Sequence, residues 1–65
     1  MNIKHIVGNI YKGKNAWGET TREILSRDGY FVKYRHTTQL GSVVQEQCMP
    51  EFQGWIRRNN AILIN

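Results

Sequence analysis

A second cysteine, a second proline and a long apolar run are all missing from this 65-residue chain. With Cys48 alone, no internal disulfide can form, so the cross-links of small secreted domains are excluded and a cytoplasmic location is expected. With no apolar run long enough for a signal peptide or a membrane span, no membrane partner is expected either. Residues 1–65 are too few for more than a single small domain.

Groups suited to catalysis or metal binding are also sparse. His5 and His36 are the only imidazoles and Cys48 is the only thiol, and no pair of them has a ligand spacing such as C-x₂-C. The carboxylates are scattered, and no glycine cluster ends in the Gly-Lys-Ser/Thr of a phosphate loop. We therefore expect a non-enzyme with no catalytic residue, metal or cofactor. Cys48 is expected to be a small buried core residue rather than a nucleophile.

Acidic side chains are outnumbered by basic ones. Nine Lys and Arg residues against five Asp and Glu give a net charge of +4, and the pI is near 9.7. This balance favours contact with nucleic acid or with an acidic protein surface.

Strand signals dominate the first three quarters of the chain. Segments rich in β-branched and aromatic residues predict strands at 3–12, 20–26, 30–37 and 43–49. Residues 22–25 also have the propensity for a helical turn. The Asp-Gly step after the second strand predicts a tight hairpin. The sequences "GKNAWG" (13–18) and "TTQLGS" (37–42) predict loops.

The C-terminal quarter begins with a helix signal. Pro50 suits a first helical turn, apolar residues follow at helical spacing, and Asn59-Asn60 is a plausible stop. The remaining "AILIN" is apolar enough for an added edge strand, a packed tail or a contact with another chain. The whole pattern predicts a mainly β fold, either a small SH3-like barrel or a bent antiparallel sheet with one short C-terminal helix. An α+β domain with the tail as its last strand is the alternative.

The third predicted strand has two contrasting faces. Alternation assigns four side chains to the interior, namely Tyr30, Val32, Tyr34 and His36. The other face then presents aromatic and basic groups on which unpaired bases stack and to which phosphates bind, with stacking contributing about 1–3 kcal/mol per base. With cations from neighbouring segments, the predicted nucleic-acid surface is Phe31, Lys33, Arg35, Lys12, Lys14 and Arg22. A merely solvated outer face is the alternative.

A second set of residues is suited to a protein partner. It comprises Trp17, Arg57, Arg58, Ile62 and Ile64. The expected role of Trp17 is to close one end of a small barrel, with a ligand contact as the alternative. The apolar tail would pair with a partner's sheet or with a second copy of the chain.

Four short motifs extend over most of the chain: "GNIY", "TREIL", "VKYR" and "QCMPEFQGW". In this order they resemble short uncharacterised proteins of lambdoid phages and prophages. The matching positions are Gly8, Tyr11, Thr21, Ile24, Val32, Tyr34, Arg35, Cys48, Met49 and Phe52. The spacer before Phe52 is shorter here than in those chains. The resemblance implies a phage or mobile-element setting, an SH3-like fold, activity by binding and a location in the host cell cytoplasm.

Three functions follow from these observations. The first is a non-enzymatic phage-type regulatory module that contacts nucleic acid through the basic and aromatic strand face. The second is an inhibitor or adaptor that binds a host or anti-phage defence protein. The third is a homodimer in which the tail completes a shared sheet.

Overall fold

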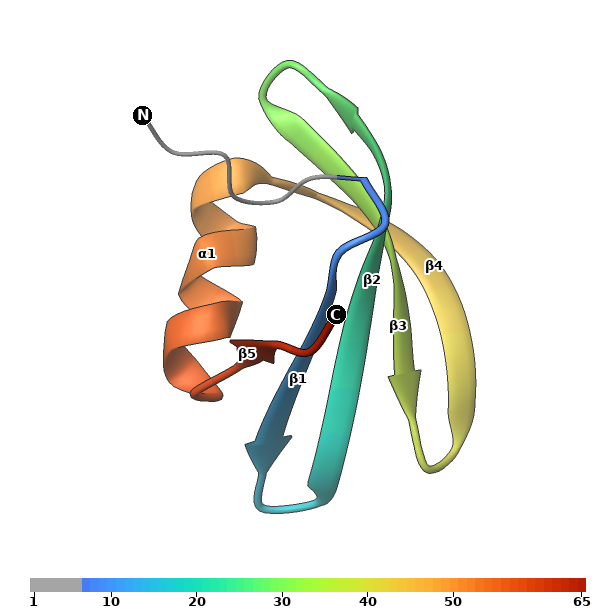
Figure 1. The fold of residues 1–65 in the computed structure, drawn as a ribbon, viewed down its shortest axis with the longest axis vertical. Coiled ribbons are helices and arrows are strands. Elements are labelled where there is room, and N and C mark those ends of the chain that lie inside the picture. The colour runs from blue at the N-terminus through green and yellow to red at the C-terminus, as the bar shows by residue number, and fades with distance from the viewer. Residues whose placement is uncertain (1–6) are drawn as a thin grey trace.

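The computed structural model describes residues 7–65. These residues form β1 (Ile10–Asn15), β2 (Gly18–Asp28), β3 (Phe31–Thr38), β4 (Gly41–Cys48), α1 (Met49–Arg58) and β5 (Ile62–Leu63). The strands make one antiparallel sheet in the order β4-β3-β2-β1-β5. Figure 1 shows a twisted, bowed sheet with α1 along one side. The predicted mainly β fold with one short helix is confirmed, and the strand order is that of a bent sheet with β4 and β5 at its edges.

Two of the three hairpin turns are shorter than the sequence predicted. Each of the three turns has two residues, at 16–17, 29–30 and 39–40, because the strands continue almost to the reversal. The loops expected at 13–18 and 37–42 are therefore mostly strand. The Asp-Gly hairpin is confirmed with a shift of one residue, since Asp28 pairs with Phe31 and Gly29 adopts a positive φ of 61° in the turn.

The first strand lies later than predicted. The strand expected at 3–12 begins at Ile10 and continues through Gly13 to Asn15, while residues 3–6 lie outside the described part of the chain. Gly13 fits because the end of the helix passes against it: a Cβ on Gly13 would lie 2.8 Å from the Asn59 Cβ. The Lys14 N–H also donates to the Asn59 carbonyl at 3.2 Å.

The core lies between the sheet and α1. Its buried members are Tyr11, Ile24, Val32, Tyr34, Phe52 and Trp55. The Phe52 ring meets Tyr11 and Tyr34 edge-on, with ring centroids 6.1 and 5.3 Å apart. Val32 and Tyr34 face inward as predicted. Tyr30 does not, because it occupies the β2–β3 turn and is exposed there. Cys48, expected in the core, is only half-buried.

The helix confirms its sequence signals. Pro50 lies in the first turn, Glu51 follows it, and Arg57 and Arg58 lie in the last turn, where each charge suits the helix dipole. Asn59 ends the helix by donating from Nδ2 to the Trp55 carbonyl at 2.9 Å. Among residues 7–65, no helix has the length and apolar character needed to cross a membrane.

The C-terminal tail is an added edge strand, the first of the three options considered. In β5, Ile62 and Leu63 pair with Lys12 and Tyr11 of β1. The Asn65 side chain extends the contact, accepting from the Ile10 N–H and donating to the Gly8 carbonyl, both at 2.9 Å. The tail therefore covers the edge of β1 within its own chain.

Candidate binding surfaces

The outer face of β3 has the geometry that the sequence predicted. Phe31, Lys33 and Arg35 are exposed, and the buried Val32 and Tyr34 alternate with them. Phe31 is 48% exposed, and its ring meets that of the exposed Tyr30 edge-on at 5.5 Å. The end of this face near the β2–β3 turn therefore offers flat aromatic surface to solvent.

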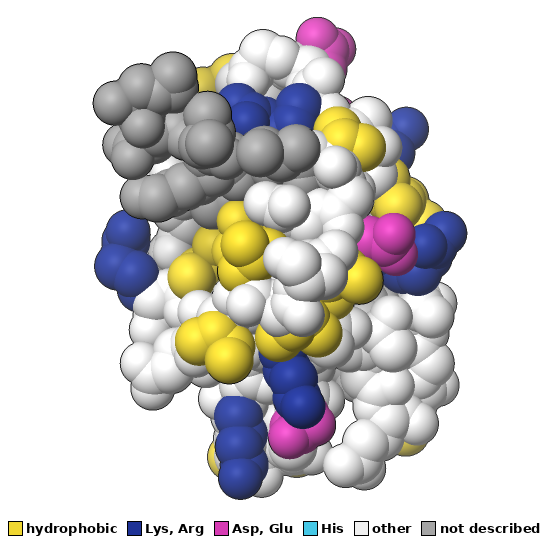
Figure 2. Space-filling view, in the orientation of Figure 1, with side chains coloured by type: hydrophobic (Ala, Val, Ile, Leu, Met, Phe, Trp, Pro, Cys, Tyr) yellow, Lys and Arg dark blue, Asp and Glu magenta, His cyan; other side chains and the backbone are white. Residues whose placement is uncertain are grey.

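The basic groups of the outer face are matched by carboxylates on neighbouring strands. Lys12 Nζ lies 3.3 Å from the Glu19 carboxylate, and Arg35 Nη1 donates to Glu23 at 3.1 Å. Lys33 is directly opposite Glu46 in the β3–β4 register. On the side shown in Figure 2, Lys and Arg are spread out rather than gathered, with acidic groups beside some of them. The positive charge of the outer face is thus largely compensated.

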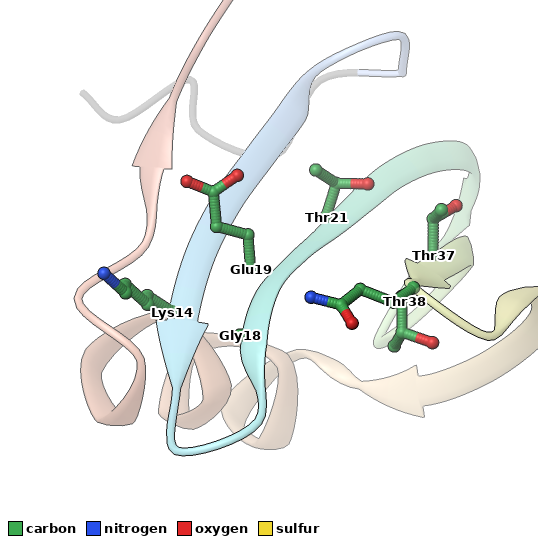
Figure 3. Close-up of a pocket in the computed structure, with 7 residues that line it drawn as sticks. Lys14, Gly18, Glu19, Thr21, Thr37 and Thr38 are labelled. Carbon is green, nitrogen blue, oxygen red and sulfur yellow. The ribbon is translucent and has the colours of Figure 1, made fainter.

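Lys14 faces a carboxylate that already forms an ion pair with Lys12. It is paired with Glu19 in the β1–β2 register and lines a shallow depression of about 450 Å³ that extends to Thr21 and Thr37. Figure 3 shows these side chains standing along an open surface of β1, β2 and β3 rather than around an enclosed cavity. The depression is lined by one cation and one carboxylate and is not a phosphate cradle.

Arg22 corrects the prediction of a nucleic-acid contact. It is only 7% exposed, because β2 directs it to the inner face beneath α1. Its Nε donates to His36 Nδ1 at 3.0 Å and its Nη1 donates to Gln47 Oε1 at 2.8 Å. The guanidinium carbon lies 4.4 and 4.3 Å from the ring centroids of Tyr34 and Trp55. Arg22 is therefore part of the core and cannot reach a phosphate.

Burial lowers the pKa of both Arg22 and His36. Desolvation lowers the pKa of Arg22, Tyr34 partly opposes this effect, and the positive charge of Arg58 adds to it. The pKa of His36 is also lowered, first by burial and then by the charge of Arg22. Because His36 Nδ1 accepts from Arg22, the proton of the neutral ring lies on Nε2.

Two large apolar side chains stand at one end of the sheet. Trp17 is 86% exposed in the β1–β2 turn, and Leu40 is fully exposed, at 100%, in the β3–β4 turn. Both turns lie at the lower end of Figure 1. The turns are neighbours, since a Cβ on Gly18 would lie 2.9 Å from the Gln39 amide nitrogen. Trp17 therefore does not close a barrel end as expected, because the strands carry it beyond the core.

A pocket of about 350 Å³ separates these two side chains. Its apolar walls are Trp17 and Leu40, and its polar lining includes His36, Thr20 and Thr38. The buried Thr20 hydroxyl oxygen has no hydrogen-bond partner within residues 7–65. We call Trp17, Leu40 and this pocket the hairpin-tip surface. It combines apolar walls with polar groups, as binding pockets do.

The other residues predicted for a protein partner are exposed but do not join the hairpin-tip surface. Arg57 and Arg58 lie in the last turn of α1, where Arg58 packs over Gly54. Ile62 and Ile64 lie on the tail, where Ile62 is next to Lys12. Figure 2 shows apolar side chains gathered in the middle of the visible face, where Figure 1 places β5.

Leu40 is the residue that sequence reasoning missed. A usable signal is an apolar side chain inside a turn sequence, "TTQLGS", where polar residues and glycine are usual.

No three His, Cys, Asp or Glu side chains of the described segment come together as a metal site. The chain matches no protein-family model, no curated protein and no solved structure.

Proposed function

We propose that this protein is a non-enzymatic binding module that docks a protein partner on the hairpin-tip surface. The exposure of Trp17 and Leu40 carries the proposal, because adjacent large apolar groups left in water mark interaction sites on small domains. Trp is enriched among the residues that contribute most binding energy at protein interfaces. In the phage setting that the sequence resemblance implies, the module is an inhibitor or adaptor of a host or defence complex.

The pocket geometry indicates how such a partner would bind. An apolar side chain of the partner would fit between Trp17 and Leu40, and His36 and Thr38 would serve its polar groups. The compensated charges of the outer sheet face favour this surface over a contact with phosphates. Exposed ion pairs contribute at most about 1 kcal/mol to stability. They nevertheless reduce the positive potential of this sheet face, which would attract a polyanion.

Affinity capture from a bacterial lysate tests the proposal. The wild-type protein should retain one dominant protein, and Trp17→Ser and Leu40→Ser should each lose it at unchanged thermal stability, since both side chains are exposed. Tyr30→Ser, which removes an exposed aromatic side chain from the β2–β3 turn outside this pocket, is the matched control and should retain it. Capture of the same protein in unchanged amount by Trp17→Ser would rule out the hairpin-tip surface as the binding site. Loss only with Ile62→Glu or Ile64→Glu would assign binding to the tail.

Nucleic-acid binding is a second candidate, favoured by one observation. The exposed Tyr30–Phe31 aromatic pair lies at the same end of the outer face as Lys33, and bases stack on such rings. Labelled single-stranded DNA titrated at several salt concentrations tests it. Binding should weaken log-linearly with salt, and Lys33→Ser should reduce the slope by about 1. Absence of binding at the lowest salt concentration would reject this candidate.

A further inference from the structure

One edge of the sheet is covered by a strand of the same chain and the other edge is open. At one edge, β5 pairs with β1 and covers it. At the other edge lies β4, eight residues from Gly41 to Cys48, with no strand of residues 7–65 on its outer side. Its sequence "GSVVQEQC" has no lysine or proline and a single charge, so it lacks the features that usually keep edge strands apart.

The backbone groups that face the open edge of β4 follow from the hairpin. The β3–β4 turn has two residues, so the pair that closes it, Thr38 and Gly41, is hydrogen-bonded. Because hydrogen-bonded and non-hydrogen-bonded pairs alternate along an antiparallel ladder, every second residue of β4 then turns its N–H and C=O outward. Before the last residue of the strand, Cys48, the outward set is Ser42, Val44 and Glu46. Their side chains point to the outer sheet face, where Val44 is 51% exposed.

We propose that β4 pairs with β4 of a second copy of this chain, which makes a continuous ten-stranded sheet. A two-fold axis perpendicular to the sheet makes the two strands antiparallel and keeps both helices on the same side. Centred on Val44, the pairing places Val44 opposite its own copy and Glu46 opposite Ser42 of the second copy. Every outward N–H and C=O of the three residues then has a partner.

The charges of β3 and β4 do not oppose a second copy in this register. Glu46 is the only charged residue of β4, and it faces a neutral serine across the interface while Lys33 remains beside it on β3. The two Arg35 side chains, each opposite Val44 on β3, are separated by three strand spacings, about 14 Å. This exceeds the Debye length of about 8 Å at physiological ionic strength, so their repulsion is largely screened.

The interface is small and the dimer is accordingly weak. One pair of edge strands buries less than the roughly 1,200 Å² of a standard interface. Sedimentation equilibrium should therefore give the monomer mass of 7.6 kDa in dilute solution and twice that mass as the protein concentration approaches about 1 mM.

Substitutions at the centre of β4 test the pairing. Val44→Glu places two carboxylates opposite each other in the dimer, but in the monomer it gives Arg35 a neighbouring partner. This variant should remain monomeric, and the matched control Val44→Thr should still dimerise. Trp17→Ser and Ile62→Glu should also dimerise as the wild type does, which separates this inference from the proposed function.

Amide exchange identifies the strand without any substitution. In dilute protein the amides of Val43 and Gln45 are protected by β3, while those of Ser42, Val44 and Glu46 exchange rapidly; at high concentration the latter three should slow. A wild-type protein that stays at the monomer mass at about 1 mM would overturn the proposal. Dimerisation of Val44→Glu with wild-type affinity, or slowed exchange at the tail instead of β4, would overturn it as well.

Discussion

Replacing Arg22 by lysine and by methionine separates two explanations of the buried cation. The arginine makes hydrogen bonds to His36 and Gln47 and stacks between Tyr34 and Trp55. Neither acceptor is a carboxylate, so the geometry and not an ion pair accounts for its position. If the planar guanidinium group, with its hydrogen bonds and ring contacts, stabilises the core, lysine should be a poor substitute although it keeps the charge.

The expected magnitudes follow from these contacts. Arg22→Lys loses one of two hydrogen bonds from a charged donor, about 1.5 kcal/mol, and part of the stacking on two rings, about 0.5–1 kcal/mol each. The sum is a loss of about 2–3 kcal/mol. Arg22→Met keeps the apolar stem against the rings and removes the desolvated charge, while His36 and Gln47, both half-buried, can turn to water. We expect Arg22→Met to lower the free energy of unfolding by only about 1 kcal/mol.

Urea and thermal unfolding provide the assay. A domain of this size has a stability of roughly 3–10 kcal/mol, so Arg22→Lys should lower the Tm by about 10–20 °C. Arg22→Met should lower it by about half as much or less. The reverse order, with lysine close to wild type and methionine strongly destabilised, would refute the argument, because the charge alone would then hold Arg22 in the core.

Three further changes have directions set by the structure. Gly13→Ala should lower the free energy of unfolding by about 1–3 kcal/mol, since its Cβ would lie 2.8 Å from that of Asn59. Gly54→Ala should be neutral or stabilising in the same urea titrations, because its Cβ would meet only the mobile end of Arg58 and alanine favours the helix. The pKa of His36 is lowered on folding by burial and by the neighbouring guanidinium, so the unfolded chain binds the proton more tightly. Stability should therefore fall as the pH drops below about 6.5; in His36→Gln this acid loss should be smaller, and an unchanged pH dependence would contradict the assignment.

Local sequence signals predicted most of the fold. The helix was predicted from Pro50, the apolar residues at helical spacing after it, and Asn59 as its stop. Its observed start, Met49, lies within one residue of the predicted one. The Asp-Gly step predicted the β2–β3 hairpin to within one residue. Alternation predicted the two faces of β3 but wrongly placed Tyr30 in the interior. The end of β1, at Asn15 rather than at residue 12, was missed for a tertiary reason. Gly13 reads as a loop glycine, but in the structure it admits the end of a helix that lies more than 40 residues away in the sequence.

The candidate site was less predictable than the fold. Alternation placed Phe31, Lys33 and Arg35 outward correctly. It could not show that Glu23 and Glu46 sit across from two of these cations, because cross-strand register depends on turn lengths that the sequence left open. Net charge describes the chain as a whole and does not report which charges are neighbours. The basic composition therefore could not show how much of the positive charge on this face is compensated.

The strongest structural argument for a binding role is that Arg22 is buried while two large apolar side chains, Trp17 and Leu40, are exposed. A chain with so small a core places an arginine inside and leaves Trp17 and Leu40 in water. Burying a leucine contributes about 1.5–3 kcal/mol, so exposing Leu40 gives up a sizeable fraction of the stability of such a domain. Natural sequences depart from consistent apolar patterning in this way mainly at functional sites. The two-residue turns hold both side chains beyond the core that residues 7–65 form.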